Sequence, residues 1–312
     1  MFDVYYDKKR FSYIHNDLIK SGIINSYKDK ELIYKTAVFV GNDINVYIDT
    51  SDGVNDDLNL YEYCGRIKKI IKDLQGKRFL LFKSAYSSKW TKNIEKLAIE
   101  NNGKVIPFFK WSFNENFYNT VFGNAEKIKV ENLKISKEYD IGIFFGDKKY
   151  HYPKPSESDS LISWSDHKKF GIKGTSKNTG YYPINSRKNL IEKLTPTNFK
   201  ILHTAVSYDE YIKLSYKCKI IINPPGIGEY TSRMVDQSYL GNCIVLRKNS
   251  YDNAFTWKNH IPEIDFNNNE WEINLKNIIN NYSQHGKACK EYFDKYWASK
   301  SIVNYFIEQI NE

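Results

Sequence analysis

The residue types best suited to chemistry lie in residues 217–246, where an apolar strand runs into a glycine-containing loop. The strand is predicted over residues 219–223, and Gly226 and Gly228 stand in the loop that follows. Glycine permits positive φ and lets the backbone approach a ligand closely. Because open α/β sheets bind ligands at the carboxyl ends of their strands, this loop is predicted to line a ligand site.

A helix is predicted to begin directly after this loop, with Thr231 or Ser232 as its cap. The free N–H groups and the dipole at such a helix start make an anion site. Arg233 falls in the first turn, where the dipole disfavours a cation unless an anion lies in front of it. A diphosphate would satisfy both the helix N-terminus and the guanidinium fork of Arg233.

Asp236 lies three residues after Arg233 and therefore on roughly the same face of the predicted helix. A carboxylate there can accept hydrogen bonds from ribose hydroxyls. The alternative is an Arg–Asp pair on a surface helix, preceded by a glycine loop that only turns the chain. We favour the ligand site because strand, glycine loop, cap, arginine and carboxylate follow the order that a nucleotide-diphosphate site needs.

Residues 203–253 resemble the C-terminal half of GT-B glycosyltransferases, and most of all the exostosin-like family. The shared features are a strand end with Pro and Gly, a Ser-x-Arg helix start, an acidic residue three positions on, and an aromatic-x-Gly before the next strand. Here they are Pro225, Gly226, Ser232, Arg233, Asp236, Tyr239 and Gly241. The family usually has Glu at the position of Asp236, and proline is common where this chain has Ile244.

The resemblance implies a GT-B fold, in which two Rossmann-like doubly wound parallel-sheet domains face a central cleft. It implies inverting, metal-independent transfer of a sugar from a nucleotide-sugar. Arg233 would hold the diphosphate and Asp236 the sugar of the nucleoside.

Four further residues are candidates for donor contacts. Arg187 and Lys188 open a predicted helix, a position from which GT-B proteins often offer a basic group to phosphate; solvated helix-start charges are the alternative. His203 ends a strand at the same sheet edge, where it would touch the base or sugar unless it is a hydrogen-bonded core histidine. Tyr182 can stack on a nucleobase.

In the first half, Asp49 ends a predicted strand and Asp52 follows it in a glycine-containing loop. GT-B enzymes keep the general base for the acceptor hydroxyl at such strand ends, so Asp52 is the predicted base, Asp49 shapes its loop, and His15 is the reserve. A Ca²⁺-like or ordinary Asx turn is the alternative. Lys83 and Tyr86, after the next strand, are predicted to contact the acceptor or the donor phosphate.

Short apolar runs that alternate with amphipathic stretches must position these residues, and this alternation predicts α/β domains with parallel sheets. Strands are predicted at 36–41, 44–49, 78–83, 104–109, 139–146, 199–205, 219–225 and 243–248. Helices are predicted at 58–74, 91–101, 186–194, 208–218, 231–242, 270–285 and 289–310.

A length of 312 residues favours two domains. We predict an acceptor-binding Rossmann-like domain over 1–137 and a nucleotide-sugar-binding one over 138–290. Residues 291–312 form a C-terminal helix that can pack back on the N-terminal domain. Residues 147–182 form a polar loop of the length that is usually functional or mobile.

The composition has 41% hydrophobic and 27% charged residues, which is ordinary for a folded protein. A net charge of +9 favours polyanionic ligands in general, but the basic residues are scattered among acidic ones, so no nucleic-acid partner is predicted. The four cysteines lack a zinc-binding spacing, and Cys218 and Cys243 are predicted to be buried thiols. No signal peptide or integral membrane segment is recognised, which predicts a cytoplasmic protein.

The sequence thus predicts a hexosyl- or pentosyltransferase that uses a nucleotide-sugar donor and a glycan or glycoconjugate acceptor, with no cofactor and no metal. A GT-B-like nucleotide-sugar epimerase is one alternative, and a non-catalytic nucleic-acid or polysaccharide binder is another. A GT-A enzyme is disfavoured because the acidic runs "SESDS" and "NDD" lack a preceding apolar strand.

Overall fold

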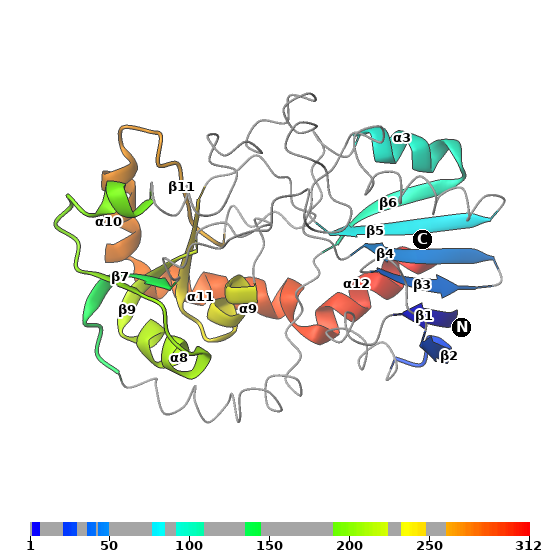
Figure 1. Cartoon of the computed structure of the whole chain (residues 1–312), viewed down its shortest axis with the longest axis horizontal. Coiled ribbons are helices and arrows are strands. Elements are labelled where there is room, and N and C mark those ends of the chain that lie inside the picture. The colour runs from blue at the N-terminus through cyan, green and yellow to red at the C-terminus, as the bar shows by residue number, and fades with distance from the viewer. Residues whose placement is uncertain are drawn as a thin grey trace, which may run out of the picture.

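The structure is a computed structural model that describes residues 2–6, 21–29, 36–41, 43–49, 77–84, 92–108, 135–144, 190–223, 232–247 and 260–312. These ranges form two α/β units, and the N- and C-termini both lie at the first of them (Figure 1). Within the described ranges, no helix combines the length and apolarity needed to cross a membrane.

The first unit is built on a six-stranded sheet with the order β2-β1-β3-β4-β5-β6. Its strands are β1 (Phe2–Tyr6), β2 (Ile24–Asp29), β3 (Thr36–Val40), β4 (Ile44–Asp49), β5 (Arg78–Ser84) and β6 (Gly103–Phe108). Helix α3 (Lys92–Glu100) connects β5 to β6. Strands β4, β5 and β6 are parallel neighbours, as predicted, and β5 is buried along most of its length.

The prediction that the first sheet is parallel throughout is wrong for β3, which runs antiparallel to both β1 and β4. Only residues 41–43 separate β3 from β4, and Gly41 N–H donates to Ile44 O across 3.1 Å. Such a connection can form a hairpin but is too short for a crossover helix. Strands β1 and β2 were not predicted, and the helix predicted at 58–74 lies outside the described residues.

The second unit is built on a parallel five-stranded sheet with the order β11-β10-β9-β7-β8. Its strands are β7 (Tyr139–Phe144), β8 (Ile201–Thr204), β9 (Cys218–Asn223), β10 (Cys243–Arg247) and β11 (Glu263–Ile264). The sequence predicted all of them except the short β11. Because β9 is buried on both faces, its near-continuous apolar run is typical of a central parallel strand.

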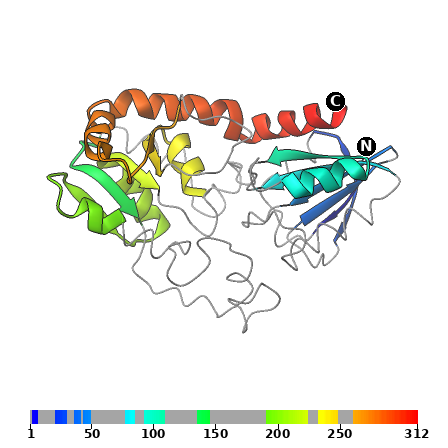
Figure 2. The same ribbon diagram turned by 90° about the horizontal axis from the view of Figure 1, so that it is seen from above.

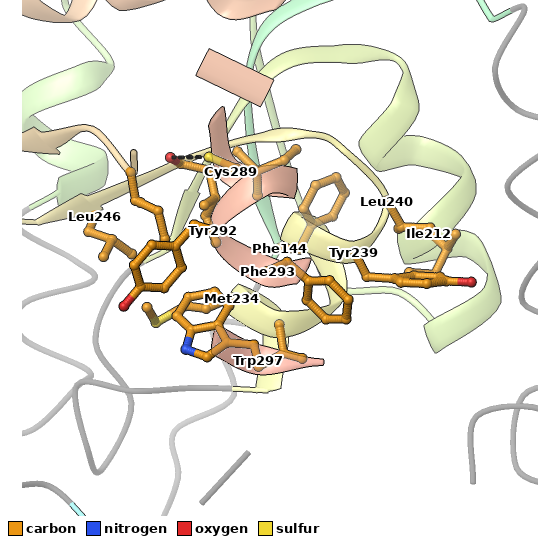
Figure 3. Packing of buried hydrophobic residues seen from close by; sticks show 14 of the residues in the cluster. Phe144, Ile212, Met234, Tyr239, Leu240, Leu246, Cys289, Tyr292, Phe293 and Trp297 are labelled. Carbon is orange, nitrogen blue, oxygen red and sulfur yellow. Dashed lines mark hydrogen bonds between the residues drawn. The ribbon is translucent and has the colours of Figure 1, made fainter. Parts of the chain in front are cut away.

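Helices cover both faces of this second sheet, as a buried parallel sheet requires. One face packs against α8 (Tyr208–Tyr216), α9 (Ser232–Tyr239) and α11 (Tyr282–Tyr292), as the cluster in Figure 3 shows. The other face packs against the helical residues 190–194 and α10 (Trp271–Asn280). The carboxyl ends of β7, β8 and β9 therefore lie at one edge, from which α8 and α9 start.

The end of the chain joins the two units. Helix α11 continues into the π-helical η1 (Phe293–Trp297), and extended backbone at Ala298 then separates it from α12 (Ser299–Asn311). Figure 2 shows this path crossing from the second unit to the first. Phe306 of α12 stacks on Phe82 of β5 with ring centroids 4.6 Å apart. The core of the first sheet is thus closed by the last helix of the chain, while the predicted domain limits at 137 and 290 stay predictions.

Candidate functional site

The candidate site begins where β9 ends and α9 starts. Strand β9 lies between β10 and β7 and ends at Asn223, whose side chain is buried. Helix α9 begins at Ser232, one residue after the start of the helix predicted over 231–242. The connecting loop, with Gly226 and Gly228, lies outside the described residues. A helix start at the carboxyl edge of a parallel sheet is the position at which anions bind most readily.

Packing holds α9 rigidly in place. Every residue from Met234 to Leu240 is buried. At its end, Gly241 adopts a φ of +73° and its N–H donates to Ser238 O over 3.1 Å. Gly286 of α11 packs so closely that a Cβ there would lie 2.5 Å from Gly241 O. An eight-residue helix fixed on all sides presents its first turn in one orientation.

Arg233 is partly exposed in the first turn of α9. It forms no ion pair with Asp236 within the part of the chain that the structure describes, so the alternative of a surface Arg–Asp pair does not hold there. Burial raises the pKa of the Tyr211 phenol in α8, and the positive charge of the nearby Arg233 guanidinium only partly offsets that rise. A cation at a helix start, without an acidic partner among the described residues, is suited to an anionic ligand.

Asp236 is buried, with 3% of its surface exposed. Burial raises the pKa of its carboxyl group well above the usual value of 3.8, which favours the neutral form in the folded protein. The sequence did not predict this burial. That Asp236 binds the ribose of a donor stays a prediction.

The buried carboxyl of Asp236 predicts a pH-dependent stability. A group whose pKa is raised on folding stabilises the fold below its unfolded pKa, and that contribution is lost as the pH rises toward the folded pKa. Asp236→Asn removes this titration. The free energy of unfolding of the variant, relative to that of the wild type, should therefore increase from pH 4 to pH 7. Denaturant titrations at both pH values measure this difference; a difference that does not change with pH would contradict it.

His203 lies in β8, opposite Ile143 of β7. Ile143 belongs to the core that packs against α10, whereas α9 packs on the other face of the sheet. The structure therefore does not bring His203 together with Arg233 on one face. A donor contact from His203 stays a prediction.

In the first unit, Lys83 is fully buried near the carboxyl end of β5. Asp49, the last residue of β4, is its register partner in the parallel ladder. The backbone of Asp49, close in sequence to the predicted base, is thus adjacent to that of Lys83, the predicted acceptor contact. Both lie at the carboxyl edge of the first sheet. The remaining candidates lie outside the described residues: Asp52, Tyr86, Tyr182, Arg187, Lys188, Gly226 and Gly228.

Two residues beside Arg233 were missed by the sequence analysis. Gln237 follows Arg233 by four positions and is fully buried, and Tyr211 reaches it from α8. The only signal in the sequence was the spacing of Arg233 and Gln237, which places both on one face of a helix.

Three of the four cysteines lie in the described part of the chain. Cys218, Cys243 and Cys289 are buried free thiols, as predicted for the first two. Burial raises the pKa of Cys218 and of Cys289 to about 12, so both stay protonated at neutral pH. No group of three His, Cys, Asp or Glu side chains suited to a metal ion occurs among the described residues.

No protein-family model and no curated protein matches the sequence. A solved sucrose-phosphate synthase from Thermosynechococcus elongatus is similar in structure, with a TM-score of 0.45 and 8% identity over 85% of this chain and 67% of that one. A glycosyltransferase from Rickettsia africae is similar with a TM-score of 0.33 and 12% identity over 83% of either chain.

The predicted α/β class is confirmed, with a parallel sheet in the second unit and a mixed sheet in the first. Each α/β unit has a run of parallel strands, and the chain returns through α12 to pack on the first sheet.

Proposed function

We propose that this protein is a glycosyltransferase that binds the diphosphate of a nucleotide-sugar at the start of α9. The observation that carries the proposal is Arg233, a partly exposed cation in the first turn of a buried helix at the carboxyl edge of a parallel sheet. A helix N-terminus and a guanidinium fork together complement the two phosphates of such a donor.

In this proposal Arg233 neutralises the charge that develops on the leaving diphosphate. Asp236, or the loop that precedes α9, holds the nucleoside, and the first unit presents the hydroxyl group of a glycan or glycoconjugate acceptor. The resemblance of residues 203–253 to exostosin-like enzymes supports an inverting reaction. A base in the first unit would take the acceptor proton from the face opposite the leaving group.

We also propose that the reaction needs no divalent metal, because the helix start and the basic side chain stabilise the diphosphate themselves. Incubation with UDP-, GDP- and TDP-sugars should release free nucleotide, and addition of EDTA should leave the rate unchanged. A strict requirement for Mn²⁺ or Mg²⁺ would contradict metal independence and favour a metal-dependent transferase.

The same incubation separates the proposed activity from its rivals. Nucleotide release with hydrolysis or transfer of the sugar supports a transferase. Interconversion of the sugar without nucleotide release would indicate an epimerase. Absence of both would contradict the proposal and favour a binding protein.

A further inference from the structure

Two buried polar atoms beside Arg233, Tyr211 Oη and Gln237 Nε2, form no hydrogen bond of good geometry within the described part of the chain, although the two side chains lie close enough to interact. Tyr211 has 6% of its surface exposed, and Gln237 has none. A buried polar group without a well-formed hydrogen bond destabilises the fold, so this pair needs a physical explanation.

Packing of α8 against the sheet fixes Tyr211. Its ring lies 5.0 Å from that of Phe144, at the end of β7, in an edge-to-face contact. A second edge-to-face contact joins it to Tyr208 at 5.8 Å. The ring is thus fixed by apolar neighbours that need no hydroxyl. The hydroxyl of Tyr211 is therefore not needed to hold the ring in place.

A hydrogen bond to its amide oxygen holds the side chain of Gln237 in place. Asn242 Nδ2 donates to Gln237 Oε1 over 2.7 Å and also lies 3.2 Å from Ser215 Oγ. Ser215 Oγ in turn donates to Ile212 O over 2.7 Å. This buried chain ties α8 and α9 together and leaves the Nε2 group of Gln237 as its unpaired end.

Tyr211 lies close to both polar groups of this face of α9. Burial raises the pKa of its phenol by more than the interaction with Gln237 and the charge of Arg233 lower it, so the hydroxyl stays neutral. A neutral hydroxyl has acceptor lone pairs, whereas the guanidinium and the amide Nε2 group are donors only. Tyr211 Oη can therefore act as the acceptor for both donors, the guanidinium of Arg233 and Nε2 of Gln237.

We propose that Tyr211 is a positioning residue, whose hydroxyl, backed by Gln237, orients the guanidinium of Arg233 toward the diphosphate of the donor. The inference rests on the proposed function, because it takes the start of α9 as the diphosphate site. The guanidinium has five N–H donors, so it can donate to Tyr211 on one side and to phosphate oxygens on the other. A pre-oriented arginine loses less side-chain entropy on binding.

Tyr211→Phe tests this by removing the hydroxyl alone and keeping both ring contacts. Calorimetry uses the nucleoside diphosphate that, among UDP, GDP, ADP, CDP and TDP, most raises the melting temperature of the wild type. We expect about tenfold weaker binding, the effect of one hydrogen bond to a charged group. The melting temperature, measured in parallel, verifies that the variant stays folded. Tyr216→Phe, on the same helix, is the matched control and should bind as the wild type does.

The second arm repeats Tyr211→Phe in the Arg233→Ala background. If Tyr211 acts through Arg233, its removal there should weaken binding no further. Wild-type affinity in Tyr211→Phe, or the same tenfold loss in both backgrounds, would overturn the inference. Unchanged binding in Arg233→Ala alone would instead overturn the proposed diphosphate site. Failure of the wild type to bind any of the five nucleotides would overturn both.

Discussion

Arg233→Ala is expected to lower turnover at least a hundredfold while the protein remains folded. A charge-assisted, partly desolvated pair between guanidinium and diphosphate contributes on the order of 2–4 kcal/mol. Because α9 is held by its buried residues and by Asn242, loss of the partly exposed Arg233 side chain should not disturb the helix. Steady-state assays with the accepted nucleotide-sugar measure the effect, and circular dichroism verifies the fold.

The matched control is Lys213→Ala, which removes an exposed cation from the last turn of α8. It should retain the wild-type rate, because the effect of Arg233 depends on contact and not on net charge. Near-normal activity of Arg233→Ala would remove the basis of the proposed function. Equal losses in both variants would indicate general attraction of an anionic substrate.

Asp52→Asn is expected to abolish transfer while donor binding is preserved. An inverting transfer needs a group within hydrogen-bond reach of the acceptor hydroxyl, opposite the leaving diphosphate, and therefore from the first unit. Asp52 follows Asp49, the last residue of β4, which is adjacent in register to Lys83. Calorimetry with the nucleoside diphosphate and a transfer assay separate binding from chemistry.

Asp49→Asn is the companion variant, since Asp49 is predicted to shape the loop. Wild-type transfer rates in both variants would contradict the assignment and place the base elsewhere, or would indicate a retaining reaction. Loss of donor binding in Asp52→Asn would also contradict a role confined to the acceptor.

The second sheet was predictable because its strands are apolar, β-branched runs separated by helices of ordinary length. The run at 219–223 needs burial on both faces, and the structure buries it as β9. The first sheet was only partly predictable. The residues 41–43 between two clear strands should have indicated a hairpin, and β1 and β2 lack comparably apolar runs.

The candidate site was predictable only where it depends on neighbours in sequence. The position of Arg233 at a helix start follows from the loop before it and the helix after it. The contact between Tyr211 and Gln237 depends on how α8 packs against α9, and the burial of Asp236 depends on the same packing. The residue pattern within one segment does not determine the angle or the register at which two helices pack.

A crystal structure with the tightest-binding nucleoside diphosphate tests the central claim most directly. We predict that both phosphates lie at the start of α9, with backbone N–H groups near Ser232 and the guanidinium of Arg233 within hydrogen-bond distance of their oxygens. A diphosphate bound elsewhere in the protein, with Arg233 not in contact with it, would contradict the account.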